Sequence, residues 1–210
     1  YENIKKGLVG SMLTVRGVKE VKAVQKIAVE QTRLGIPLII GFDVIHGYKT
    51  LAPIPLAEAA SWDLAAIEKS AEAAASEAAA SGINWTFGPM MDISRDARWG
   101  RVMEGAGEDP YLASKIAVAR VKGFQKHFAG YGFVVAGLEY NVAEIGNNTL
   151  YNQVLPPFKA AVDTGLRTLM TSFNTINGIP ASGDKYLLRE TLKNKWGFSG
   201  FVISDWASIR

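Results

Sequence analysis

The stretch WGFSGFVISDW (196–206) decides the fold class. Gly197 ends a helical segment, the mostly apolar run Phe201–Ser204 follows, and the carboxylate of Asp205 comes directly after that run. The run lacks strict polar alternation, which is typical of a strand that helices bury on both faces. We therefore expect Asp205 to stand at the carboxyl end of a buried parallel strand.

The rest of the chain repeats this alternation of short apolar runs and longer amphipathic segments. Five further strands are predicted at Val9–Leu13, Leu38–Phe42, Trp85–Met90, His127–Ala129 and Thr168–Phe173. Helices are predicted at Val18–Arg33, Leu64–Ser81, 110–125, Leu150–Thr164 and Lys185–Trp196. This order predicts a mainly parallel sheet with right-handed crossovers.

Residues at the predicted helix ends support these boundaries. Asp63 is a suitable N-cap for the helix that begins at Leu64, and Gly82 suits the position just past its end. Asp109 followed by Pro110 is a typical helix start, because proline at the first helical position gives up an N–H that would have no partner there.

Polar side chains at the strand ends favour a barrel over an open doubly wound sheet. They are Asp43, Asp92, Lys126-His127, Phe173-Asn174 and Asp205. Loops at the carboxyl ends of strands build the site in (β/α)8 barrels, whereas a dinucleotide-binding sheet would carry GxGxxG, which this sequence lacks. We count six strand–helix units. The prediction is an α/β fold, a TIM-barrel-like (β/α)8 domain over residues 1–210 that is incomplete.

Two consequences of this organisation concern missing parts. An incomplete barrel leaves an unpaired strand edge, so we expect a homodimer or a companion chain that completes it. The helix predicted to end near Gln125 also runs directly into Lys126-His127, where a connection of about two to six residues is usual. The sequence therefore predicts that residues are missing between Gln125 and Lys126.

Composition excludes several classes of function. The net charge is only +3 and the basic residues are scattered, so we expect no nucleic-acid partner. No run approaches the roughly 20 apolar residues of a membrane span, and no basic segment leads into an apolar leader at Tyr1. With no cysteine and two histidines we expect no disulfide and no metal site, and the absence of cofactor motifs predicts no cofactor.

Carboxylates next to aromatic and basic residues indicate carbohydrate chemistry. Asp205 beside Trp206 suits a nucleophile at a sugar site, since an indole face binds the apolar face of a pyranose. Asp43 suits two sugar hydroxyls, and Lys126 and His127 reach one site only at a strand end or bulge. The alternative is structural: both aspartates also suit helix caps, and the charged loop 92–101 is expected to hold itself together by Arg–Asp pairs.

Seven segments resemble glycoside hydrolase family 3, specifically its bacterial β-glucosidase branch, and they follow the family's order along nearly the whole chain. They are GIPLIIGFDVIHGYKT (35–50), PIPLAEAASWD (53–63), INWTFGPMMDISRDARWGRVMEGAGEDPYL (83–112), KHFAGYG (126–132), VLPPFKAAVDTG (154–165), MTSFNTINGIPA (170–181) and WGFSGFVISDW (196–206).

This resemblance implies a retaining β-glucosidase acting through a covalent glycosyl-Asp intermediate, in a periplasmic or secreted location. It implies that Asp205 is the nucleophile. It further implies a set of residues around the glucosyl unit: Asp43, Arg101, Lys126, His127, Met170, Phe173 and Trp206.

The chain also departs from the family pattern. Val135 and Leu138 stand where the family normally has a glutamate and an arginine, and the arginine contributes to sugar binding. The family's general acid/base glutamate comes from a C-terminal domain outside these residues, and Glu104, Glu108 and Glu139 are weak stand-ins. Without a general acid, typically worth about 10²–10⁴ in rate, we expect little turnover from these 210 residues alone.

Three functions compete at this point. The first is the retaining β-glucosidase. The alternative is a catalytically impaired fragment or engineered barrel derivative with only a structural or weak sugar-binding role, which the departures at Val135 and Leu138 favour. The third, a TIM-barrel enzyme for phosphorylated ligands, is disfavoured because no glycine-rich phosphate loop is present.

Overall fold

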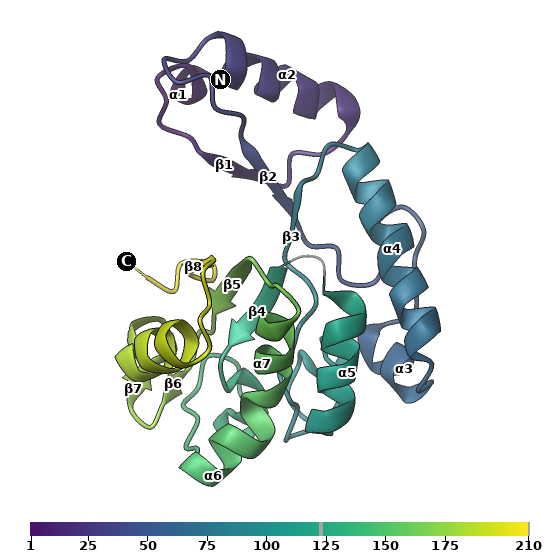
Figure 1. Cartoon of the computed structure of the whole chain (residues 1–210), viewed down its shortest axis with the longest axis vertical. Helices are drawn as coiled ribbons and strands as arrows, with labels where there is room; N and C mark the ends of the chain where they lie inside the picture. The colour runs from purple at the N-terminus through teal and green to yellow at the C-terminus, as the bar shows by residue number, and fades with distance from the viewer. Residues whose placement is uncertain (122–123, 210) are drawn as a thin grey trace. The chain divides into compact units, whose positions relative to one another are not determined.

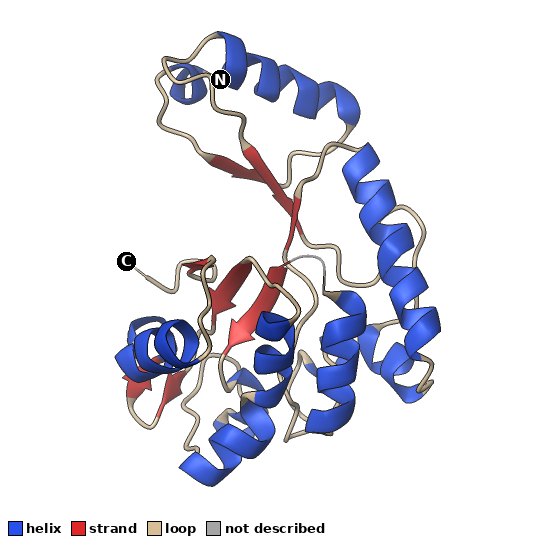
Figure 2. Cartoon of the chain, in the orientation of Figure 1, coloured by secondary structure: helices blue, strands red, loops and turns tan. Residues whose placement is uncertain are grey.

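The computed structural model describes residues 1–121 and 124–209, with Phe124 and Gln125 described by their backbone alone. The chain divides into two compact units, and each is described by itself. The first comprises Tyr1–Ala52 and Ser70–Phe87, and the second Pro53–Lys69 and Gly88–Arg210. Figure 1 labels the elements and Figure 2 separates helices from strands.

The first unit is built on a parallel three-stranded sheet. Its strands are β1 (Ser11–Leu13), β2 (Ile39–Phe42) and β3 (Trp85–Thr86), in that order. The helices are α1 (Glu2–Lys5), α2 (Val18–Glu30) and the second half of α4 (Leu64–Ala80). Helical spacing puts Val21, Val24 and Ala28 of α2 into the core. Gly82, at φ +88°, follows α4 where a Cβ would lie 2.6 Å from Val21.

The second unit holds a second parallel sheet and a hairpin. The sheet strands are β4 (Phe124–Phe128), β5 (Thr168–Thr171) and β8 (Phe201–Ile203), and the hairpin strands are β6 (Thr175–Ile176) and β7 (Ile179–Pro180). The α-helices of this unit, besides the first part of α4, are α3 (Pro55–Ala60), α5 (Pro110–Arg120), α6 (Asn147–Thr149) and α7 (Pro156–Asp163). Leu150–Val154 and Tyr186–Lys195 are π-helical.

Packing in the second unit fixes the strands that carry the site. The Phe128, Phe158 and Leu169 side chains are completely buried, and the rings of Phe128 and Phe158 meet edge to face at 5.3 Å. Phe128 lies on β4, Leu169 on β5 and Phe158 on α7, so this core holds both strands against a covering helix. The loops at the strand ends therefore start from rigid positions.

The structure confirms the predicted strand positions and corrects two details. The α-helix that begins at Pro110 ends at Arg120 rather than near Gln125, and β4 begins at Phe124, before the predicted His127. The connection between helix and strand thus lies before Gln125, and Gln125 and Lys126 are neighbours within β4. The prediction of missing residues between them assumed a helix that continues to Gln125, which the structure does not have. Lys122 and Gly123 of that connection lie outside the described residues.

The predicted caps at Asp63 and Asp109 are confirmed. Asp63 Oδ1 accepts from the Ala66 N–H at 2.9 Å, and Asp109 Oδ1 accepts from the Leu112 N–H at 2.7 Å. The β6–β7 hairpin and the short helices α1 and α3 were not predicted from the sequence. The described strands form two three-stranded sheets and this hairpin rather than a closed barrel. Within those same residues, no helix is long and apolar enough to cross a bilayer.

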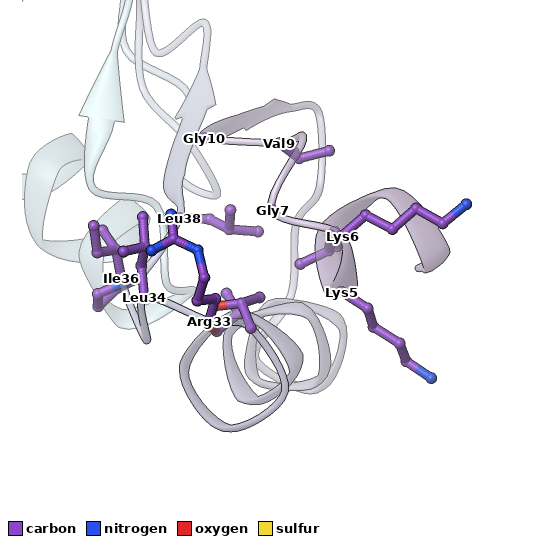
Figure 3. Close-up of a pocket in the computed structure, with 13 residues that line it drawn as sticks. Lys5, Lys6, Gly7, Val9, Gly10, Arg33, Leu34, Ile36 and Leu38 are labelled. Carbon is purple, nitrogen blue, oxygen red and sulfur yellow. The ribbon is translucent and has the colours of Figure 1, made fainter.

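A cavity of about 250 Å³ lies within the first unit, beside α1 and the segment that follows α2. Figure 3 shows the Lys5 and Lys6 side chains extending away from Leu38 rather than converging on the cavity. None of the residues that line it belongs to the predicted site.

Candidate active site

The ends of β4, β5 and β8 bring several predicted site residues together in the second unit. Cα register pairs Phe128 of β4 with Thr171 of β5, and Met170 of β5 with Ile203 of β8. The register of β4 shifts between Gln125 and Phe128. This irregularity matches the expectation that Lys126 and His127, as strand neighbours, reach one site only at a strand end or bulge.

His127 lies between two carboxylates and is itself completely buried. Asp92 Oδ2 accepts from the His127 backbone N–H at 2.8 Å and lies 2.9 Å from Nδ1. On the other side, Nε2 lies 3.2 Å from Asp205 Oδ2, outside hydrogen-bonding geometry. The double contact with Asp92 fixes the ring, and its free edge is therefore aimed at Asp205.

Asp205 is held as a carboxylate. Burial by itself would raise its pKa, but contact with His127, the Trp206 backbone N–H and the charge of Lys126 together hold the pKa below the ordinary 3.8. Asp205 Oδ1 accepts from that N–H at 2.6 Å. The group is therefore ionised at neutral pH while its side chain is only 13% exposed, as an attacking carboxylate requires.

A second ion pair stands beside this carboxylate. Arg101 binds Glu104 through two contacts, Nε to Oε1 at 2.7 Å and Nη2 to Oε2 at 3.0 Å. Burial works against the Arg101 charge, but Glu104, Asp92 and Asp205 raise its pKa overall. Lys126 Nζ lies 4.0 Å from Glu104 Oε2. Two cations thus lie beside the acids, and guanidinium and ammonium N–H groups are suitable donors to sugar hydroxyls.

Aromatic rings pack against one side of His127. Tyr131 is completely buried, and its ring lies 5.3 Å from the rings of both His127 and Trp99. Phe173 lies 5.8 Å from Tyr131 on a further side. The Arg101 guanidinium stands 5.9 Å from the centre of the Tyr131 ring. These rings form an apolar wall beside His127. Charges interact more strongly next to such apolar surroundings than in water.

The predicted residues differ in where they lie. Arg101, Lys126, His127 and Asp205 interact directly or through their charges, and Phe173 adjoins them through Tyr131. Met170 is buried on β5, whereas Trp206, next to Asp205, is 77% exposed. Asp43 follows β2 in the first unit, so its part in sugar binding stays a prediction.

Sequence reasoning missed how Asp92, Glu104 and Tyr131 contribute. The charged loop does hold one Arg–Asp pair as expected, Arg98 Nη2 to Asp96 Oδ2 at 2.6 Å, but Asp92 binds His127 rather than an arginine. The position of Asp92 at the end of a predicted strand was the feature of the sequence that indicated a place in the site. The described residues contain no group of three or more His, Asp or Glu side chains arranged to hold a metal ion.

Comparisons with known proteins agree on one family. Residues 1–210 match the family described as "Glycosyl hydrolase family 3 N terminal domain". A protein named "Periplasmic beta-glucosidase" from Salmonella typhimurium is 40% identical over an alignment that covers all of this chain and 29% of the relative. A "Putative beta-xylosidase" from Formosa agariphila is 32% identical, with 97% of this chain and 31% of the relative covered.

Solved structures give the same result. A beta-glucosidase from Listeria innocua in complex with glucose superposes with a TM-score of 0.93 at 42% identity, covering 95% of this chain and 30% of that one. A b-glucosidase from Erythrobacter marinus gives a TM-score of 0.93 at 33% identity, covering 100% and 31%. The chain thus spans about 30% of the length of the relatives it matches.

Proposed function

Because this chain belongs to glycosyl hydrolase family 3, through its N-terminal domain, we propose that it carries the nucleophile of a retaining β-glucosidase that removes terminal non-reducing β-D-glucosyl residues. The observation that carries the proposal is Asp205. It is ionised, mostly shielded from solvent and flanked by His127, with the charges of Arg101 and Lys126 nearby. The relatives named as beta-glucosidases support the substrate class.

The proposed reaction has two displacements at C1 of the glucosyl residue. An oxygen of Asp205 bonds to C1 as the bond from C1 to the glycosidic oxygen breaks, and a general acid protonates the leaving oxygen. Water then bonds to C1, gives a proton to the same acid/base group, and Asp205 leaves as a carboxylate. The family resemblance assigns that acid/base group to a further domain.

The other site residues would bind the sugar. Lys126 and Arg101 carry N–H groups for its hydroxyls, and the His127 edge that faces Asp205 is placed for a hydroxyl next to C1. Such contacts tighten as positive charge develops in an oxocarbenium-like transition state. By resemblance we assign Asp43, Met170, Phe173 and Trp206 to the same subsite.

The incomplete (β/α)8 barrel, a single domain over 1–210, is our proposal for the architecture. Both sheets are parallel with their strands in sequence order, and Met90, just after β3, bridges Lys126 of β4 in parallel. Further barrel units, or a second copy or companion chain, would complete it. A periplasmic or secreted location is supported by the name of the Salmonella relative.

Release of the aryl group from an aryl β-glucoside tests the function. Asp205→Ala removes the attacking carboxylate, so we expect the rate to fall by at least about a thousandfold. Asp163→Ala is the matched control, because Asp163 makes an exposed ion pair with Lys159, and its rate should equal that of the wild type. Hydrolysis that survives Asp205→Ala would refute the assignment.

A second candidate, sugar binding without turnover, is favoured by the loop after Tyr131. Leu138 and Val135 are 60% and 47% exposed, and neither offers a donor to a sugar hydroxyl. Calorimetric titration with glucose separates the two functions. Heat of binding in a protein that releases no aryl group supports the second candidate, whereas binding together with turnover supports the first.

A further inference from the structure

Tyr131 is a buried tyrosine whose hydroxyl is tied to a surface loop. The phenol donates a hydrogen bond to Glu139 Oε2. Glu139 is partly exposed, yet its other oxygen, Oε1, is buried and has no hydrogen-bond partner among the described residues. Glu139 thus anchors the far end of the Tyr131 side chain.

The ring at the near end of this side chain faces the site. It meets the His127 ring at 5.3 Å with an interplanar angle of 77°. Trp99 and Phe173 pack on its other sides at 5.3 and 5.8 Å. A displacement of the Tyr131 ring would therefore open space beside the imidazole, whose outer torsion is soft in the absence of such packing.

We propose that Glu139 is a positioning residue: it anchors the Tyr131 hydroxyl, which holds the Tyr131 ring against His127 and keeps Nε2 aimed at Asp205. From the sequence, Glu139 is only a weak stand-in for the general acid. The structure assigns it a different task, since its carboxylate is engaged with a tyrosine. The reason for aiming Nε2 at Asp205 rests on the proposed function, but the position of the His127 ring can be measured without turnover.

The backbone of the loop supports this role. Tyr140 has φ +62°, a left-handed conformation that is uncommon for a bulky residue and persists where surrounding contacts hold it. The Tyr140 ring packs edge to face on Phe173 at 4.9 Å, and the preceding residue, Glu139, is bound to the Tyr131 hydroxyl. Loss of the hydroxyl leaves the Glu139 carboxylate without its phenol partner, which destabilises this arrangement.

Histidine NMR tests the proposal directly. The chain has two histidines, and His46 lies in the other compact unit, so it serves as the internal reference. In Tyr131→Phe and Glu139→Ala we expect the His127 ring resonances to move and the pKa of Asp205, followed by its carboxyl carbon, to rise from its lowered value. Glu139→Gln should bring these values most of the way back to those of the wild type, because the amide oxygen still accepts from the phenol, although the amide N–H₂ group then takes the buried position of Oε1.

The control is Tyr186→Phe, which also removes a hydroxyl from a hydrogen-bonded pair, with Tyr151, away from the site. It should leave His127 and Asp205 unchanged. Should Tyr131→Phe fail to fold, Glu139→Ala and Glu139→Gln decide the question, since that side chain is partly exposed. Unchanged His127 resonances and Asp205 pKa in a folded Glu139→Ala variant would overturn the proposal.

Kinetics separates this inference from the function on which it rests. In protein that hydrolyses an aryl β-glucoside, misalignment of the site should lower kcat/KM by about ten- to a hundredfold in Glu139→Ala, with recovery in Glu139→Gln. If the wild type shows no hydrolysis, the proposed function fails while the NMR result still decides the positioning role. If hydrolysis is present and Glu139→Ala matches the wild type, the positioning role fails alone.

Discussion

Replacement of Asp92 by asparagine tests how the site is held in place. One oxygen of Asp92, a side chain that is completely shielded from solvent, receives both the backbone N–H and Nδ1 of His127, at 2.8 and 2.9 Å. Its other oxygen is buried and has no hydrogen-bond partner among the residues that the structure describes. Asp92→Asn leaves an uncharged amide oxygen at one position and places an amide N–H₂ group at the other, where no described residue accepts its protons.

The magnitude follows from these contacts. Hydrogen bonds to charged groups contribute roughly 1.5–3 kcal/mol each, and a buried donor without a partner costs about 1–3 kcal/mol. Because the amide oxygen still accepts at least one of the two bonds, we expect Asp92→Asn to lower the free energy of unfolding by about 2–4 kcal/mol. The His127 resonances should shift in the folded variant.

Urea denaturation followed by tryptophan fluorescence measures the change in stability. Asp96→Asn is the matched control: it lies in the same loop, but its partner Arg98 is exposed, so its denaturation midpoint should equal that of the wild type. An Asp92→Asn protein as stable as the wild type, with unchanged His127 resonances, would refute the view that Asp92 orients the imidazole.

Three further predictions concern pH, backbone contact and the core. The pKa of Asp205 is lower in the folded protein than the ordinary 3.8, so its ionised form stabilises the fold above pH 3.8, and that contribution is lost as the pH falls through the lower folded value. The difference in unfolding free energy between the wild type and Asp205→Asn, measured in urea, should therefore shrink between pH 7 and pH 3. A constant difference would contradict the lowered pKa. Gly200→Ala places a Cβ 2.0 Å from the Arg167 carbonyl oxygen, which accepts the Phe201 N–H, so thermal unfolding should show a clearly lower Tm, whereas Gly183→Ala, which meets nothing within 4 Å, should not. Phe158→Ala leaves a cavity at a fully buried position between β4 and α7 and should lower the free energy of unfolding in urea by about 3–5 kcal/mol. A decrease below about 1 kcal/mol would show that this core does not hold the strand.

The alternation of apolar runs with helical segments was enough to predict where the strands lie. The strand before Asp205 is an example: its run Phe201–Ser204 was predicted from composition alone, and β8 spans Phe201–Ile203. The end of α5 was harder to predict. Val118 and Val121 continue a helical apolar spacing, whereas α5 ends at Arg120 and β4 pairs with β5 from Phe124 onward.

Pairwise contacts in the site depended on geometry that a sequence does not carry. Asp92 and His127 are 35 residues apart, and their contact requires the segment after β3 to pair with β4, as the Met90–Lys126 bridge does. The strand-end rule placed Asp92, Lys126, His127 and Asp205 as candidates because parallel strands end on one side. It gave no sign of Tyr131, an ordinary aromatic residue in the sequence, whose role rests on ring packing.

The central claim is that Asp205 attacks the anomeric carbon. A 2-deoxy-2-fluoro-β-glucoside with a good leaving group slows the second displacement and lets the glycosyl-enzyme accumulate, and digestion followed by mass spectrometry then locates the sugar. The account predicts one fluoroglucosyl adduct on the peptide that contains Asp205, and none in Asp205→Ala. An adduct on any other carboxylate, or release of the aryl group with no adduct and inversion at C1, would contradict it.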